Sequence, residues 1–282
     1  MEAEAHMDFS KMHGLGNDFL IFEDNGADTD WNALASKLCR RRLSVGADGI
    51  MVVLPSTSAD IRMRIINADG SEAEMCGNGI RCFAKYVYER GIVAKEDMTV
   101  ETLAGMMKPH LIIKDSKVAE VSVDMGQPSF DRESIPMDGE GSMFDVDIQA
   151  AGQNVTVSTL RMGVPHTMVL TDDIESLDTA ALGPAIETHP IFPKKTNVNF
   201  VQVLDRENIR VLTWERGAGF TLACGTGSCA SVVAMHKKGL IEPKAAVHLA
   251  AGRLFIEYLD DGRVIMTGPA EEVFTATLND NQ

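Results

Sequence analysis

The chain has 282 residues, enough for two domains of ordinary size. Its 41 Asp and Glu residues outnumber 26 Lys and Arg, and the formal net charge of −15 argues against a general nucleic-acid binder. Five cysteines are too few, and odd in number, for a secreted disulfide framework, and no apolar run approaches the roughly 20 residues that cross a bilayer. We therefore expect a soluble cytoplasmic protein with reduced thiols.

The first six residues lack the basic and apolar segments of a signal peptide. The pair His6-Met7 is typical of a cloning junction. The fold is therefore predicted from residue 7 onward.

The first predicted helix begins after Asp30, a residue suited to capping, and continues to Arg41. Its apolar residues recur at helical spacing on one face, at Trp31, Leu34, Ala35 and Leu38. Runs of alternating apolar residues predict strands at 62–66, 118–123, 155–157, 199–203, 254–258 and 264–266.

Two further helices are predicted directly after cysteines. The helix after Cys76 has helical spacing of apolar residues and should stop at Gly91, because glycine adopts the left-handed conformation that ends helices. The helix after Cys224 closes at Gly239 and is apolar on nearly all sides. It should therefore be surrounded by protein.

These two helices belong to an internal repeat. Residues 61–91 match residues 209–239 at a shift of 148 without a gap, so that Cys76-Gly77-Asn78-Gly79 falls on Cys224-Gly225-Thr226-Gly227. A second block matches at a shift of 149, where Gly14-Leu15 and residues 19–21 fall on Gly163-Val164 and residues 168–170. The near-constant shift predicts a duplicated domain, although two short matches can also arise by chance.

We expect an α+β fold of two pseudo-symmetric domains, each a mostly antiparallel sheet or barrel wrapped around a central helix. The predicted halves are residues 7–125, completed by a C-terminal strand at 267–282, and residues 126–266. They join near residues 120–135, where Gly126-Gln127-Pro128-Ser129 interrupts a strand.

Both repeats place a cysteine before Gly-x-Gly at a helix start. The first N–H groups of a helix have no partner within it, so they bind anions and stabilise a thiolate. If the two ends face each other across a domain cleft, a small anionic ligand has one thiol on each side. Inversion of a stereocentre needs this arrangement, with a base on one face and an acid on the other. The N–H groups holding the adjacent carboxylate would stabilise the carbanion, and no metal or pyridoxal cofactor is required.

Simpler interpretations of the cysteines remain open. Zinc sites favour Cys-x₂-Cys pairs, whereas the local spacings here are Cys76-x₅-Cys82 and Cys224-x₄-Cys229. A disulfide between Cys76 and Cys224 could form on oxidation. Cys39, Cys82 and Cys229 are interpreted as small buried core residues.

At these residues the chain resembles the diaminopimelate epimerase family of pyridoxal-independent epimerases. The resemblance runs from Lys11 to Ala270 and is strongest at 67–82 and 214–227. It implies the two-domain fold and a homodimer with Phe274 near its surface. It also implies interconversion of LL- and meso-2,6-diaminopimelate for lysine and cell-wall synthesis, without cofactor or metal.

The resemblance implies a role for each matching residue. Cys76 and Cys224 would be the acid–base pair, and N–H groups around Gly77, Asn78, Gly225 and Thr226 would hold the reacting carboxylate. The remaining substrate-binding positions match Asn17, Asn67, Asn197, Glu215 and Arg216, with Glu215 receiving an ammonium. Glu215 and His166 would also tune the thiols. Without the resemblance, plainer roles are open: turn residues for Asn17 and Asn67, a surface ion pair for Glu215 and Arg216, and a core or turn histidine for His166.

Two departures from the family pattern bear on substrate choice. Val164 stands where the family often has Asn before Pro-His, and Gly49 stands where it sometimes has Gln. Two other hypotheses therefore stay open. One is a sibling racemase or epimerase acting on another amino acid, such as histidine or lanthionine. The other is a non-catalytic amino-acid-binding or thiol-redox protein.

Overall fold

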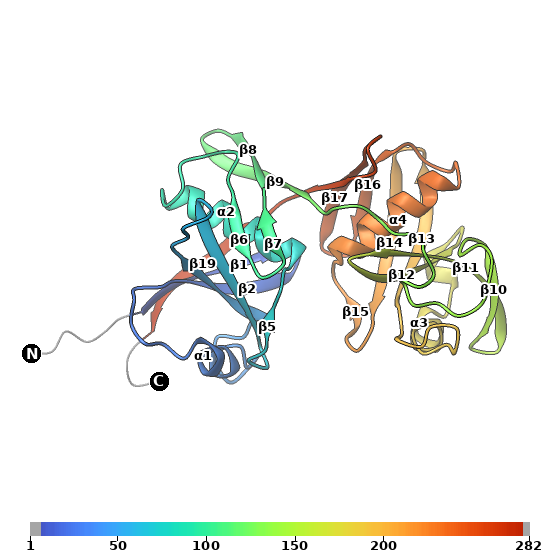
Figure 1. Ribbon diagram of the computed structural model, residues 1–282. Coiled ribbons are helices and arrows are strands. Elements are labelled where there is room, and N and C mark those ends of the chain that lie inside the picture. The colour runs from blue at the N-terminus through green and yellow to red at the C-terminus, as the bar shows by residue number, and fades with distance from the viewer. Residues whose placement is uncertain (1–6, 279–282) are drawn as a thin grey trace, which may run out of the picture. The chain divides into compact units, whose positions relative to one another are not determined.

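The computed structural model describes residues 7–278, which divide into two compact units (Figure 1). Unit 1 contains the described residues up to Val123 and those from Gly268 onward, and unit 2 is Asp124–Thr267. Residues 1–6, which include His6 of the predicted cloning junction, and the end of the predicted C-terminal strand, 279–282, lie outside the described residues. We propose that the two units are the two copies of the repeat.

The main sheet of unit 1 has the order β19-β1-β2-β3-β4-β6-β7, with β5 paired to β4, while β8 and β9 pair with each other and are not part of this sheet. The pairs β2–β3 and β4–β6 are parallel and the others are antiparallel. Its strands and helices are β1 (Met7–Gly14), β2 (Asn17–Glu23), α1 (Trp31–Leu38), β3 (Gly49–Leu54), β4 (Ile61–Asn67), β5 (Glu72–Ala73), α2 (Gly77–Glu89), β6 (Val100–Thr102), β7 (Gly105–Met107), β8 (His110–Lys114), β9 (Lys117–Asp124) and β19 (Glu271–Leu278).

Unit 2 repeats this topology neighbour for neighbour, since β10-β11-β12-β13-β14-β16-β17 follows the same order of parallel and antiparallel pairs. The strand β15 pairs with β14 as β5 pairs with β4, and β18 pairs with β17. Its elements are β10 (Val146–Ala150), β11 (Gln153–Met162), β12 (Val164–Leu170), η1 (Ile174–Ser176), α3 (Thr179–Glu187), β13 (Asn197–Asp205), β14 (Asn208–Glu215), β15 (Gly219–Thr221), α4 (Gly225–Lys237), β16 (Lys244–Leu249), β17 (Gly252–Tyr258) and β18 (Val264–Gly268).

Strand pairing corrects the second block of the predicted repeat. In β2–β3, Phe19 pairs with Gly49, whereas in β12–β13, His166 pairs with Asn197. With β3 and β13 aligned at a shift of 148, β2 aligns with β12 at 147, not at 149. The cause is the hairpin before each strand, because two residues separate Gly14 from Asn17 and only Gly163 separates Met162 from Val164.

The helices α2 and α4 are packed against the strands of their own sheets (Figure 1). Ten residues of α4 are buried, which confirms that this helix is surrounded by protein. The predicted stops are also confirmed, since Gly91 and Gly239 have φ values of 70° and 73° directly after the helix caps.

The other two helices pack on the opposite faces of the sheets. Asp30 caps α1 as predicted, but the helix ends at Leu38 and not at Arg41. The reason is local, because the Gly46 N–H donates to the Leu38 carbonyl and Arg42 adopts a left-handed conformation.

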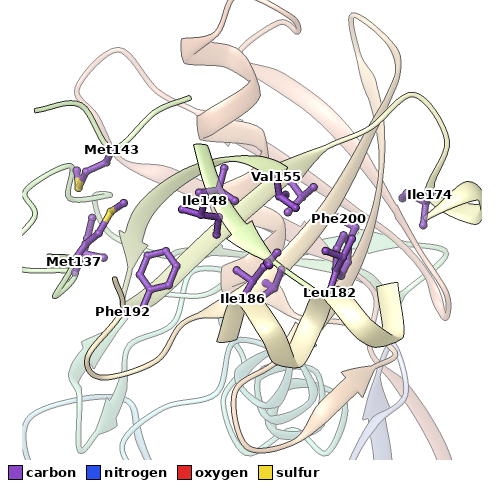
Figure 2. Packing of buried hydrophobic residues seen from close by; sticks show 14 residues of the cluster. Met137, Met143, Ile148, Val155, Ile174, Leu182, Ile186, Phe192 and Phe200 are labelled. Carbon is purple, nitrogen blue, oxygen red and sulfur yellow. The ribbon is translucent and has the colours of Figure 1, made fainter. Parts of the chain in front are cut away.

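The helix α3 was not predicted, since Gly183 and Pro184 lie inside it. Asp178 caps it, and Leu182 and Ile186 pack with Phe200 of β13 in a buried hydrophobic cluster of unit 2 (Figure 2). The sheets are therefore buried on both faces. No helix among residues 7–278 is long and apolar enough to cross a membrane.

Candidate active site

Cys76 is the N-cap of α2 and is held in an extended conformation (φ −136°, ψ 120°). Its sulfur accepts the Gly79 N–H at 3.4 Å, and it contacts the Asn17 Oδ1 at 3.3 Å. Asn78, which is buried, donates from Nδ2 to the same Asn17 oxygen at 3.4 Å. The structure thus brings the predicted residues Cys76, Asn17 and Asn78 together at one helix end.

The carboxamide of Asn17 is oriented by a carboxylate. Its Nδ2 donates to Asp48 Oδ2 at 2.7 Å, and the other oxygen of Asp48 accepts from Arg41 at 2.8 Å. Arg41 also binds Asp18, whose pKa is lowered because hydrogen bonds from Arg41 and Lys11 outweigh the effect of burial. Asp48 was not among the predicted site residues.

Cys224 caps α4 in the same way, with φ −119° and ψ 111°, and accepts the Gly227 N–H at 3.4 Å. Its neighbours differ from those of Cys76. The Thr226 hydroxyl lies 3.6 Å from the sulfur and 3.0 Å from His166 Nε2. The other ring nitrogen of His166, Nδ1, lies 3.2 Å from Asn199 Nδ2.

This chain of contacts fixes the state of His166. Complete burial, with a smaller contribution from the Arg216 charge, lowers the pKa of His166 to about 3, so the ring is neutral at neutral pH. Because Asn199 Nδ2 can only donate, Nδ1 accepts and the proton is on Nε2. The ring therefore donates to Thr226, which leaves the Thr226 proton free to point toward Cys224.

Asn199 was not among the predicted site residues. It lies on β13, two residues after Asn197 and between the buried Val198 and Phe200. Its side chain is fully buried and its Oδ1 accepts from Thr213 at 3.0 Å. A polar residue in a strand with two buried faces is itself a signal of a functional or structural hydrogen bond.

The remaining predicted residues of unit 2 gather at the end of β14. Asn197 Oδ1 accepts the backbone N–H of Arg216 at 2.9 Å, and Glu215 accepts from Thr221 at 2.7 Å. Arg216 lines a pocket of about 420 Å³ in unit 2. The lining residues are Glu133, Ser134, Pro136, Arg161, Gly163, Val164, Pro165, Lys194 and Arg216.

Glu187 of α3 supports this turn. It accepts from Trp214 Nε1 at 2.7 Å and from the Gly217 N–H at 3.2 Å. Burial would raise the pKa of Glu187, but the bonds from Trp214, Lys195 and Gly217 lower it overall. Glu187 is therefore a charged residue that stabilises the chain on both sides of Glu215 and Arg216. This role was not predicted from the sequence.

Asn67 lies at the end of β4 and its Nδ2 donates to Ser71 at 3.0 Å. Gly49 pairs with Asn67 across the sheet, and a Cβ at Gly49 would lie 2.6 Å from the Ile66 carbonyl oxygen. The close approach of these strands explains glycine at this position.

In the corrected alignment, two polar residues lie near each cysteine. The pair near Cys76 and the pair near Cys224 come from positions that do not correspond in the repeat. Asn17 and Asp48 in unit 1 align with Val164 and Thr196 in unit 2. Phe19 and Met51, which lie near Gly79, align with His166 and Asn199. The residues of unit 1 and their counterparts in unit 2 are therefore Asn17–Val164, Asp48–Thr196, Phe19–His166 and Met51–Asn199.

The other three cysteines are buried, as predicted. Burial raises the pKa of Cys39 to about 11 and that of Cys82 to about 12. These thiols stay protonated and unreactive near neutral pH. Within residues 7–278 no three His, Cys, Asp or Glu side chains are grouped so as to hold a metal ion.

Solved structures of low sequence identity share the fold. A Bacillus anthracis phenazine biosynthesis protein of the PhzF family has a TM-score of 0.72 at 17% identity, covering 97% of this chain and 99% of its own. A hydroxyproline epimerase from Agrobacterium vitis has a TM-score of 0.69 at 15% identity, covering 100% and 95%. The fold is therefore of the class found in that PhzF-family protein and that epimerase. In this chain a cysteine caps the central helix of each unit.

Sequence comparison narrows this class. The family model for diaminopimelate epimerase matches residues 9–130 and 158–273. The diaminopimelate epimerase of Moorella thermoacetica is 52% identical over 95% of this chain and 98% of its own length, and that of Pelotomaculum thermopropionicum is 50% identical over 95% and 98%. The chain belongs to the diaminopimelate epimerase family.

Proposed function

We propose that this protein interconverts LL-2,6-diaminopimelate and meso-2,6-diaminopimelate without a cofactor, as a step toward lysine and peptidoglycan precursors. The observation that carries the proposal is the pair of cysteine-capped helices on two sheets of one topology. Membership of the family and about 50% identity to proteins named for this reaction support the choice of substrate.

The proposed chemistry needs one thiolate and one thiol. The thiolate removes the α-proton of one stereocentre, which leaves a carbanion and a new thiol. The second thiol delivers its proton to the opposite face of that carbon and becomes a thiolate. The substrate gains and loses one proton, and exchange with solvent restores the starting states of the two sulfurs.

The helix ends supply the electrostatic part of this mechanism. The N–H groups at Gly77, Asn78, Gly225 and Thr226 would bind the α-carboxylate, where charge grows as the carbanion forms. Arg216 would pair with the distal carboxylate, together with Asn67 and Asn197, and Glu215 would receive an ammonium. Asn17 would bind substrate as well as contact Cys76.

Incubation of LL-diaminopimelate with enzyme in D₂O tests this function. We expect meso product with deuterium at the inverted α-carbon. The variants Cys76→Ser and Cys224→Ser should each lower the rate by about 10²–10⁴-fold, because each removes one acid–base group. The matched control is Cys229→Ser, at a cysteine outside the proposed chemistry. Negligible turnover of diaminopimelate by the parent enzyme would overturn the assignment.

Val164 favours a second candidate, a sibling epimerase or racemase with another amino-acid substrate. It lies in the pocket beside Arg216, at the position that aligns with Asn17, and brings no amide there. Relative kcat/KM values for diaminopimelate, lanthionine, histidine and glutamate separate the candidates. A higher value for any of the last three would favour the sibling.

We further propose a homodimer that works in the cytoplasm. Strand β19 ends the sheet of unit 1, and Val273 and Phe274 on it are 54% and 41% exposed. Exposed apolar residues on an edge strand are suited to pairing with another chain. Sedimentation analysis should give twice the chain mass, and Phe274→Asp should lower it; an unchanged mass would count against this surface. Fluorescence microscopy of a tagged chain tests the compartment.

A further inference from the structure

The two cysteines cap equivalent helices, but the groups that contact their sulfurs differ in kind. Beside the Gly79 N–H, a side-chain atom that contacts the Cys76 sulfur is a carboxamide oxygen, Asn17 Oδ1, at 3.3 Å. At Cys224 it is the Thr226 hydroxyl at 3.6 Å. An oxygen without a proton can only accept, so it favours an S–H group and disfavours a thiolate.

At Cys76, Asp48 determines which atom of the Asn17 carboxamide faces the sulfur. An ionised carboxylate accepts only, so the Asn17 atom 2.7 Å from Asp48 Oδ2 must be the NH₂ group. Asn17 Oδ1 is then turned to the sulfur. Asp48 cannot easily turn away, since it also accepts from Arg41 at 2.8 Å and from the Asp18 N–H at 3.1 Å.

At Cys224 the neighbouring group is set up as a donor. Asn199 donates to His166 Nδ1, so that Nε2 carries the proton and donates to Thr226 Oγ1 at 3.0 Å. With its oxygen already accepting, Thr226 has its own proton free for the sulfur. A hydroxyl donor stabilises a thiolate.

We propose that Asp48 and Asn199 are positioning residues that hold the two sulfurs in different states before substrate binds, Cys76 as the thiol and Cys224 as the thiolate. The importance of this difference for catalysis rests on the proposed function. The states themselves can be measured without substrate, so the two proposals fail separately.

Other charged and titratable groups act on both sulfurs. On α2, the strands that contact it and the segment before β3, these groups include Lys11, His13, Asp18, Arg41, Asp48, Arg81, Cys82 and Lys85. On α4 and the strands that contact it, or directly after β14, they include Arg161, His166, Glu215, Arg216 and Cys229. Arg81 favours a Cys76 thiolate, but its guanidinium donates to the Gly77 and Pro269 carbonyls and is the same in every variant compared below.

The experiment measures the alkylation rate of each cysteine by iodoacetamide over about pH 6–10, with peptide mass spectrometry resolving Cys76 from Cys224. In the parent protein, we expect Cys224 to react at a lower pH than Cys76. Asp48→Asn should move the Cys76 profile about one pH unit lower, a tenfold gain in thiolate, and leave the Cys224 profile in place. Asn199→Leu should move the Cys224 profile higher and leave Cys76 unchanged.

Two controls separate positioning from simple loss of charge or structure. On an Asn17→Ala background, Asp48→Asn should lose most of its effect on Cys76, because no carboxamide is left to orient. If Asn199→Leu does not fold, Thr226→Val replaces it, and Thr226→Ser should restore the parent Cys224 profile. Equal profiles in the parent, an Asp48→Asn shift that persists without Asn17, or a Thr226→Val profile equal to that of the parent would overturn the proposal. Epimerisation in D₂O reports on the proposed function independently.

Discussion

The third residue of each central helix is a glycine, and the two positions should respond very differently to alanine. A Cβ at Gly79 would lie 2.6 Å from the terminal methyl of Met51, the flexible end of a side chain. A Cβ at Gly227 would collide with Oδ1 of the buried Asn199 and lie 3.2 Å from the Cys224 sulfur. The two glycines are equivalent in the repeat, so each is the matched control for the other.

The structure gives the magnitudes. Alanine in place of a helical glycine gains about 0.5–1 kcal/mol. At Gly79, movement of the Met51 methyl roughly offsets this gain, so Gly79→Ala should change the free energy of unfolding by less than about 1 kcal/mol. At Gly227, overpacking costs about 1–3 kcal/mol and each displaced hydrogen bond of Asn199 about 1 kcal/mol. Gly227→Ala should therefore destabilise unit 2 by about 2–4 kcal/mol.

The two tryptophans allow each unit to be followed by itself, because Trp31 belongs to unit 1 and Trp214 to unit 2. Urea unfolding of Gly79→Ala is followed by Trp31 fluorescence on a Trp214→Phe background. Gly227→Ala is followed by Trp214 on a Trp31→Phe background, each against its own parent. Equal destabilisation of the two units, or a Gly227→Ala protein as stable as its parent, would refute this reasoning.

Three further changes have defined outcomes. The pKa of His166 is lowered from an ordinary 6.5 to about 3. Between these two pH values, His166 is protonated in the unfolded chain and neutral in the folded chain. Stability should thus fall as pH drops below 6.5, by up to about 1.4 kcal/mol per pH unit, and His166→Gln should flatten this slope in urea titrations from neutral to acid pH. Glu187→Gln removes the charged acceptor of Trp214 and Gly217, so the free energy of unfolding of unit 2 should fall by about 1–3 kcal/mol and KM should rise. An unchanged KM would show that Glu187 does not contribute to substrate binding. Val164→Asn should lower KM for diaminopimelate by up to about tenfold if an added amide reaches the substrate, and steady-state kinetics that show no change would place Val164 outside the contact.

The elements that sequence reasoning predicted well are those fixed by short-range chemistry. The cysteine caps are set by residues three apart, and the stops at Gly91 and Gly239 by a single left-handed residue. Such features need no tertiary information. The helix α3 is the opposite case, since Gly183 and Pro184 break its local pattern and its formation depends on burial against β13.

The alignment of the repeat failed at one point for a physical reason. Glycine recurs at Gly14 and Gly163, and matching them places β2 two residues out of register with β12. Only backbone pairing shows that the second hairpin is shorter. A slip of two residues leaves each side chain on the same face but moves it about 7 Å along the strand, so the register decides which residues reach the cysteine. Asp48 and Asn199 could not be placed beside the sulfurs without it.

Duplication of a domain gives two equivalent thiols, and the different polar residues beside them determine which thiol carries the proton. Two thiols in identical surroundings that did not interact would titrate together, and the state with one proton between them would be populated to at most about half at any pH. Within that state the proton would be on either sulfur with equal probability. Stereochemical inversion requires a thiolate on one side and a thiol on the other. An exact duplication would therefore place the two sulfurs correctly without determining which of them carries the proton.

The polar residues beside the sulfurs come from positions that do not align: Asn17 with Asp48 in one unit, and His166 with Asn199 in the other. They present an acceptor to one sulfur and a donor to the other. The symmetry of the fold places two sulfurs at matching helix ends, and its local violation assigns the proton to one of them.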